Sequence, residues 1–388
     1  MGGVTAEQAL PAAEEPVHAA SIVHITDTHL FVNEHGVTRS RRERTRLVRV
    51  LERLGVSDLD FATADMAERF SQALQRAVDL ERAMLPATGP IVAVHTGDAE
   101  AFGSSDQRQA FSGFGHVASI LAGAGLQDAV VAVYGNHDVW PGSVALFGLN
   151  GPRHDPQKRA LDEAVDIVGH LPPPAPLRFP TGAGFDMVFV PLNSVNSDAV
   201  RGGLLAYGRV SHHPPSIAPV FDLVAAYELR PRDLNIAVMH HPPHFYRPLT
   251  VRDRLGVGHL EDAEFVAREL AAAGIDLVLA GHRHRLDPAF GGHVDAADPT
   301  QWPLPAGVAQ LVAISPTMPT DPAAARHDPA DSPRSGLCVY RVMAASGSVS
   351  LHRLIHPTGP TSDPEPIFEG MTVAGLAARG ITTTGPTS

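Results

Sequence analysis

Five short apolar segments of this chain are each followed, directly or after one glycine, by aspartate, asparagine or histidine. The segments are SIVHIT, IVAVHT, VVAVY, IAVM and DLVLA. The residues after them are, in the same order, Asp-Thr-His, Gly-Asp, Gly-Asn-His-Asp, His-His-Pro-Pro and Gly-His-Arg-His. Short β-branched or apolar runs that end at polar residues or Gly predict strands buried on both faces. Longer amphipathic segments alternate with them, which favours an α/β architecture.

The expected elements can be given by range. The predicted strands cover residues 21–26, 91–96, 130–134, 187–191, 236–239 and 277–280. The predicted helices cover residues 41–54, 66–84, 106–122, 157–168 and 262–273. Gly274 follows the last helix, where a C-cap is expected. Near the C-terminus, residues 336–343 and 348–355 flank an Ala-Ala-Ser-Gly turn and predict a β-hairpin.

The length allows one large domain or two ordinary ones, and the pattern favours one. Residues 1–20 are rich in Ala, Glu and Pro and predict a loose leader, while residues 358–388 predict a weakly ordered tail. A domain spanning residues 21–357 remains, with insertions at about 31–65 and about 141–220. Long loops of this kind often shape the entrance to a substrate site.

The polar residues after the strands are expected to converge in space. In open α/β sheets, ligands bind beyond the carboxyl ends of the strands. Carboxylate and amide oxygens combined with imidazole nitrogens suit Mn, Fe, Zn or Co better than Ca. The single cysteine, Cys338, excludes a Cys-rich zinc module and a disulfide framework. The candidate ligands are too many for one ion and suit two ions that share a carboxylate. The glycines that precede Asp98, Asn136 and His282 are expected where the backbone approaches closely.

Each motif also has an ordinary structural explanation. A lone Asp-x-His or Gly-Asp at a strand end is usually a turn or a cap, and a lone Gly-His-x-His fits either explanation. Gly-Asn-His-Asp is more specific. All five motifs in order, each after an apolar strand, favour a metal centre over five unrelated turns.

In order and wording, these motifs resemble those of the calcineurin-like metallophosphoesterase superfamily, and the resemblance covers roughly residues 21–357. The His-His-Pro-Pro and Gly-Asn-His-Asp motifs are most similar to those of the bacterial branch that includes the cyclic-nucleotide phosphodiesterases. The resemblance implies a four-layer αββα sandwich of two mixed β-sheets flanked by helices. It also implies a dinuclear metal site at the C-terminal ends of the strands.

The resemblance assigns the metal ligands residue by residue. One ion would be held by Asp27, His29 and His284, the other by Asn136, His240 and His282, and Asp98 would bridge them. Two such ions bind phosphate oxygens and lower the pKa of a bridging water. The resulting hydroxide attacks phosphorus in line with the leaving oxygen.

Four further residues are candidates for catalysis or substrate binding. The resemblance makes His137 the histidine near the leaving group, where it suits a general acid or a donor to the phosphoryl oxygen. Asp138 either orients His137 or caps a helix. Pro242 favours His240 over His241 as the ligand, so that His241 and Arg283 are candidate substrate contacts.

Net charge and the distribution of apolar residues exclude several classes of protein. The net charge of −12 argues against a nuclease and against nucleic-acid binding, which needs a basic surface. No apolar run of ~20 residues and no signal peptide are found, so no membrane span and a cytoplasmic location are expected. The sequence predicts a metal-dependent hydrolase of a small anionic phosphodiester, with cyclic nucleotides among the candidates. Alternatives are a phosphomonoesterase on the same site and a non-catalytic scaffold, and a homodimer is left open.

Overall fold

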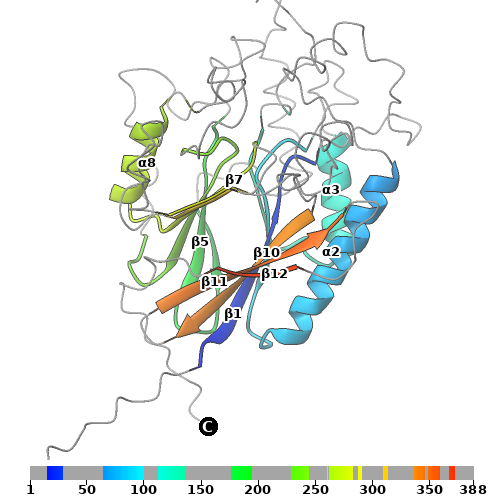
Figure 1. Ribbon diagram of the computed structural model, residues 1–388, viewed down its shortest axis with the longest axis horizontal. Coiled ribbons are helices and arrows are strands. Elements are labelled where there is room, and N and C mark those ends of the chain that lie inside the picture. The colour runs from blue at the N-terminus through cyan, green and yellow to red at the C-terminus, as the bar shows by residue number, and fades with distance from the viewer. Residues whose placement is uncertain are drawn as a thin grey trace, which may run out of the picture.

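The described part of the chain forms two six-stranded mixed sheets packed face to face. The computed structural model describes residues 15–28, 64–99, 112–135, 138, 176–194, 229–243, 260, 262–282, 287–290, 309–312, 336–345, 348–358 and 367–371. Helices cover the outer faces of both sheets (Figure 1). The α/β class and the αββα sandwich are therefore confirmed. Among the described residues, no helix combines the length and the apolar character that crossing a bilayer requires.

The first sheet has the order β12-β11-β10-β1-β2-β3. Its strands are β1 (Val17–Ile25), β2 (Ile91–His95), β3 (Val130–Ala132), β10 (Gly336–Ala345), β11 (Ser348–Pro357) and β12 (Ile367–Met371). β1, β2 and β3 run parallel, whereas β10 pairs antiparallel with both β1 and β11. The β10–β11 pair is the predicted hairpin.

The second sheet has the order β4-β5-β6-β7-β9-β8. Its strands are β4 (Leu177–Pro180), β5 (Asp186–Pro191), β6 (Leu234–Val238), β7 (Leu277–Ala280), β8 (Asp287–Phe290) and β9 (Ala309–Val312). β5, β6, β7 and β9 run parallel, and the two edge strands pair antiparallel. The carboxyl ends of the parallel strands β1, β2, β6 and β7 carry four of the five predicted motifs.

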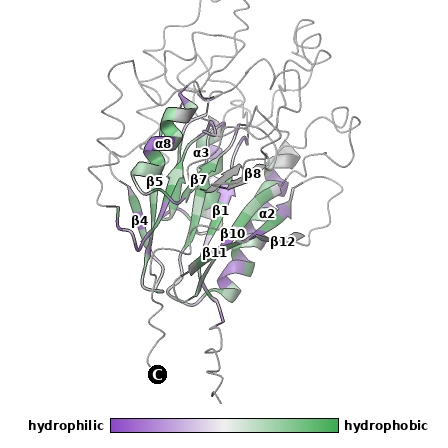
Figure 2. Cartoon of the chain, turned by 60° about the vertical axis from the view of Figure 1, so that its left-hand side comes forward, coloured by the Kyte–Doolittle hydropathy of each residue, from purple (hydrophilic) through white to green (hydrophobic). Residues whose placement is uncertain are grey.

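Alternating side chains of the central strands build the layers. Ile22 of β1 packs in the core between the two sheets, together with Ile236 and Tyr340. Its neighbour Val23 points to the opposite face and belongs to the core beneath the helices. Burial of each such side chain contributes about 1.5–3 kcal/mol. The central strands are thus covered on both faces, which explains why their sequences are continuous apolar runs (Figure 2).

Three helices form the outer layers. α2 (Ala64–Met84) and α3 (Ser112–Gly123) cover the first sheet, and α8 (Ala263–Ala272) covers the second. α2 is amphipathic, since Phe70, Leu74 and Val78 recur at a spacing of four and are fully buried. α8 ends before Gly274, which has a φ of 80° and allows the chain to turn into β7.

Some elements differ from the predictions. β1 begins inside the predicted leader, and β12 lies within the predicted tail. β4 falls in the predicted insertion at 141–220, and β8 and β9 were not predicted. β4 is an edge strand that ends at Pro180, so its sequence signal is weak. The predicted helices 41–54 and 157–168 and residues 106–111 lie outside the described residues, as does most of the 31–65 insertion. The division into domains stays a prediction.

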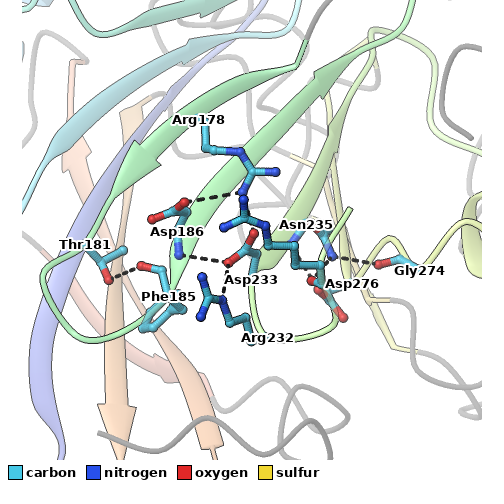
Figure 3. Close-up of polar contacts among 10 residues, drawn as sticks. Arg178, Thr181, Phe185, Asp186, Arg232, Asp233, Asn235, Gly274 and Asp276 are labelled. Atoms are coloured by element: carbon cyan, nitrogen blue, oxygen red, sulfur yellow. Dashed lines mark hydrogen bonds and ion pairs between the residues drawn. The ribbon is translucent and has the colours of Figure 1, made fainter. Parts of the chain in front are cut away.

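A polar network joins the starts of β5, β6 and β7, at the end of the sheet opposite the motifs (Figure 3). The buried carboxylate of Asp233 accepts hydrogen bonds from Arg178 Nη1 at 2.5 Å and from the Asp186 N–H at 3.3 Å. The Asn235 side chain donates to the Gly274 carbonyl at 3.1 Å. These contacts fix where the three strands begin.

We expect Asp233→Asn to lower the free energy of unfolding by about 1–3 kcal/mol, because it weakens charge-assisted bonds to a buried group. Urea denaturation monitored by circular dichroism measures the change. Asp79→Asn is the matched control, because the Asp79 side chain is 60% exposed, and we expect an effect within about 0.5 kcal/mol. Equal stability of the two variants would show that the network does not stabilise the sheet.

Candidate metal centre

The ends of β1, β2, β6 and β7 meet. Asp27 follows β1, Asp98 follows β2, and His240 follows β6, and each offers a ligand atom within 4.8 Å of the other two. We call these three the carboxylate group. His240 Nε2 lies 3.3 Å from Asp98 Oδ2 and 3.1 Å from Nδ1 of His282, which follows β7. Residues from three other motifs thus lie around the His240 imidazole.

A second set consists of imidazoles alone. His240, His241 and His282 each offer a ligand atom within 4.8 Å of the others, and we call them the histidine group. The ring centroid of His241 lies 4.9 Å from that of His240 and 4.5 Å from that of His282. The two groups share His240. The arrangement thus offers both oxygen and nitrogen donors, a mixture that suits transition-metal ions.

Five of the predicted site residues cannot be placed. They lie outside the described residues, and they are His29, Asn136, His137, Arg283 and His284. Their predicted roles stay predictions. The structure places Asp27, Asp98, His240 and His282 together, with His241 beside them.

Hydrogen bonding orients His240 as a ligand. Its Nδ1–H donates to the Thr96 carbonyl at 2.8 Å, which leaves Nε2 for the centre. Burial lowers the pKa of His240, but the carboxylates of Asp98 and Asp27 outweigh burial and raise this pKa to about 9. In the metal-free protein, the Nε2 proton therefore lies beside Asp98. A metal that binds Nε2 displaces this proton.

The backbone is strained where the candidate ligands lie. Among the described residues, the non-glycine residues with positive φ are Asp27 at 49°, Asp98 at 57° and His282 at 71°. Such conformations persist where neighbouring contacts hold them, and they cluster at functional sites. Here the Asp27 N–H donates to the Gly97 carbonyl at 2.9 Å, and the His282 N–H donates to Asp27 Oδ2 at 3.1 Å. The strain directs each side chain toward the centre.

Two motif glycines make room for these contacts. A Cβ on Gly135 would lie 2.0 Å from Asp98 Oδ1, and a Cβ on Gly281 would lie 1.9 Å from Thr26 Oγ1. Real side chains do not approach this closely. The prediction that glycine serves close approach is confirmed at both positions, because any larger residue would separate the motifs.

Asp138 joins the second and third motifs. Its buried Oδ2 accepts the N–H of Asp98 at 2.9 Å and the N–H of Gly135 at 2.7 Å. This cross-loop role was not predicted from the sequence, although the three-residue spacing from Gly135 is typical of an aspartate that binds nearby backbone. Asp138 therefore positions Asp98, and its predicted action on His137 stays a prediction.

The sequence analysis also missed Ser194. The predicted strand 187–191 became β5, and the polar pair Asn193-Ser194 follows it as polar residues follow the other strands. Ser194 is fully buried, and its Oγ lies 3.0 Å from His241 Nδ1. The strand-then-polar pattern was the signal that could have identified it.

Two buried histidines predict acid sensitivity. Burial, aided by His95, lowers the pKa of His24 to about 3, and burial lowers the pKa of His356 on β11 to about 4. An unfolded chain binds these protons near pH 6.5, so stability is full above that pH and is lost as the pH falls toward these values. We expect metal-free protein to lose about 2 kcal/mol at pH 5 through His24 alone. Urea denaturation at pH 7 and pH 5 tests this, and an equal pH effect in His24→Gln would contradict it.

Comparison with known proteins identifies a family. The model of the calcineurin-like phosphoesterase family matches residues 20–286, which is more than half of the chain and includes all five motifs. No match is found among curated proteins.

Solved structures show weak similarity. GAP50, the anchor in the inner membrane complex of Plasmodium, is 10% identical with a TM-score of 0.44, and 92% of this chain and 90% of that chain are covered. The purple acid phosphatase PPD1 of yellow lupin is 10% identical with a TM-score of 0.45, at 97% and 58% coverage, so this chain spans little more than half of that protein. A metallophosphoesterase of Sphaerobacter thermophilus is 12% identical with a TM-score of 0.26, at 83% and 84% coverage. Scores this low support no statement about function.

Proposed function

The chain belongs to the calcineurin-like phosphoesterase family, and we propose that it is a phosphodiesterase that hydrolyses a small anionic diester with two bound metal ions. One observation carries the proposal: Asp27, Asp98, His240 and His282, which follow four separate strands, bring carboxylate oxygens and imidazole nitrogens together at one centre. Metal-dependent phosphoester hydrolysis follows from the family. The preference for a diester is the proposed part.

The donors fit transition-metal ions. Asp27 and Asp98 offer buried oxygens, and His240 and His282 offer nitrogens, with His240 Nε2 held toward the centre by Thr96. Mn, Fe, Zn and Co suit such a mixed set. Two ions bound here would supply an activated water and neutralise charge on the phosphoryl oxygens. We propose that His29, Asn136 and His284 complete the ligand set.

The chain's own residues prepare the site. Asp98 Oδ2 lies 3.3 Å from Nε2 of His240, the residue that both groups share, and the Asp98 backbone N–H is held by Asp138. We propose that its carboxylate would bridge the two ions. Because the ligand loops are fixed before substrate binds, little reorganisation is needed during reaction. We propose that His137 delivers the proton to the leaving oxygen and that Arg283 meets the substrate.

Two features support a small diester. The sequence motifs are most similar to those of the branch that includes cyclic-nucleotide phosphodiesterases. Cyclic nucleotides are therefore candidate substrates. The net charge of −12 gives little attraction to the phosphate backbone of a nucleic acid.

A substrate comparison tests the proposal. We expect Mn-loaded protein to cleave bis-p-nitrophenyl phosphate faster than p-nitrophenyl phosphate, and chelated protein to cleave neither. A panel of cyclic nucleotides, linear diesters, phospholipid headgroup esters and monoesters then defines the substrate class. A strong preference for monoesters would contradict the diester proposal and favour the phosphomonoesterase. Full metal loading without turnover on any ester would favour a scaffold.

A further inference from the structure

Two adjacent histidines of the histidine group form hydrogen bonds of opposite kinds. His240 Nδ1 lies 2.8 Å from the carbonyl oxygen of Thr96, which can only accept, so Nδ1 donates and Nε2 is the nitrogen available to a metal. His241 Nδ1 lies 3.0 Å from Ser194 Oγ, a hydroxyl that can donate or accept. The tautomer of His241 therefore depends on the direction of the bond to Ser194.

The other contact of Ser194 determines that direction. Ser194 Oγ also accepts the backbone N–H of His241 at 3.0 Å. The hydroxyl has one hydrogen to donate, and within the described residues His241 Nδ1 is the acceptor that it reaches. Ser194 is fully buried, so leaving this hydrogen without an acceptor would cost free energy. Ser194 thus donates to Nδ1, and the hydrogen of the neutral ring resides on Nε2.

We propose that His241 is not a metal ligand but a hydrogen-bond donor beside the metal centre, and that Ser194 holds it in this form. A metal at Nε2 of His241 would force the ring hydrogen onto Nδ1, and the buried hydroxyl of Ser194 would then lose its acceptor. His241 nevertheless lies as close to the centre as the ligands do, since a ring nitrogen is within 4.8 Å of the ligand nitrogens of His240 and His282. It is also as buried as His240 and Asp27, so burial does not set it apart.

This role deepens the proposed function and rests on it. Negative charge on the phosphoryl oxygens shifts during hydrolysis, and a fixed N–H donor in a buried site stabilises such charge. The arrangement also explains how two neighbouring histidines serve different purposes. Thr96 makes His240 a ligand, whereas Ser194 makes His241 a donor.

Metal content separates a donor from a ligand. We compare His241→Phe, which removes the donor, His241→Gln, which keeps an N–H near Nε2, and His240→Gln. We expect both His241 variants to bind as many Mn ions per chain as the wild type, and His240→Gln to bind fewer. Turnover should fall about 100-fold in His241→Phe and recover in part in His241→Gln. Loss of an ion from both His241 variants would overturn the proposal.

The tautomer is measured without any substrate. Protein with ¹⁵N-labelled histidine, in which the His241 signals are identified by their loss in His241→Gln, reports which ring nitrogen carries hydrogen. We expect hydrogen on Nε2 in the wild type and in Ser194→Thr, and a mixture in Ser194→Ala. Hydrogen on Nδ1 in the wild type would overturn the proposal. A protein that fails to cleave diesters would refute the proposed function yet leave the metal content and the tautomer as measured.

Discussion

Replacing His240 with glutamine should lower phosphoester turnover roughly 1,000-fold, because this residue belongs to both donor groups. Its Nε2 lies 3.3 Å from Asp98 and 3.1 Å from His282, so no other described side chain links the two groups in this way. Removing the imidazole also takes away a buried side chain that lies beside Asp27 and Asp98. Steady-state kinetics with Mn, together with metal analysis, measures both effects.

A matched variant separates this loss from a general effect of removing a buried histidine. His356 is also buried but lies on β11, where Glu81 and Arg341 influence its pKa. We expect His356→Gln to keep its metal and its turnover. Normal metal content and normal turnover in His240→Gln would refute the shared role of His240.

Adding a single methyl group at Gly135 should weaken Mn binding by about 100-fold or more. The new Cβ would lie 2.3 Å from the Asp98 backbone nitrogen as well as 2.0 Å from its carboxylate, so the loop that carries Asp98 must move. A displacement of about 1 Å at such a site costs roughly 100-fold in function. Gly281→Ala should behave similarly through Thr26 and Asp27. Isothermal titration with Mn measures the loss of affinity.

Gly115 provides the control for these glycine substitutions. It lies in α3, where an added Cβ meets nothing within 4 Å. Gly115→Ala should keep Mn affinity and raise stability by about 0.5–1 kcal/mol, because alanine favours the helix. Equal Mn affinity in Gly135→Ala and Gly115→Ala would show that the close approach at Gly135 is not required.

The central strands could be predicted because their sequence signal is local. β2 and β7 are apolar runs with clear ends, and their observed bounds match the predicted ones within one residue. β4 and β12 were missed because they are short edge strands with a weak sequence signal of their own. β12 lies in a segment whose composition suggests weak order, yet it pairs with β11. Whether such a segment forms a strand depends on the sheet beside it, which its own sequence does not show.

In the candidate metal centre, too, some features could be predicted from the sequence and others could not. The convergence of Asp27, Asp98, His240 and His282 could be predicted, because polar residues at the carboxyl ends of neighbouring parallel strands meet. The hydrogen bonds between Asp98 and Asp138 and between Ser194 and His241 could not be predicted. They join loops that are 40 and 47 residues apart, and they depend on how the loops pack.

Metal analysis of the wild-type protein tests the central claim most directly. The chain is freed of metal with a chelator, loaded with Mn, separated from unbound ions and analysed by mass spectrometry of the metal. We predict about two Mn ions per chain, as the proposed dinuclear centre requires. A protein that is folded by circular dichroism yet binds no stoichiometric metal would contradict the account.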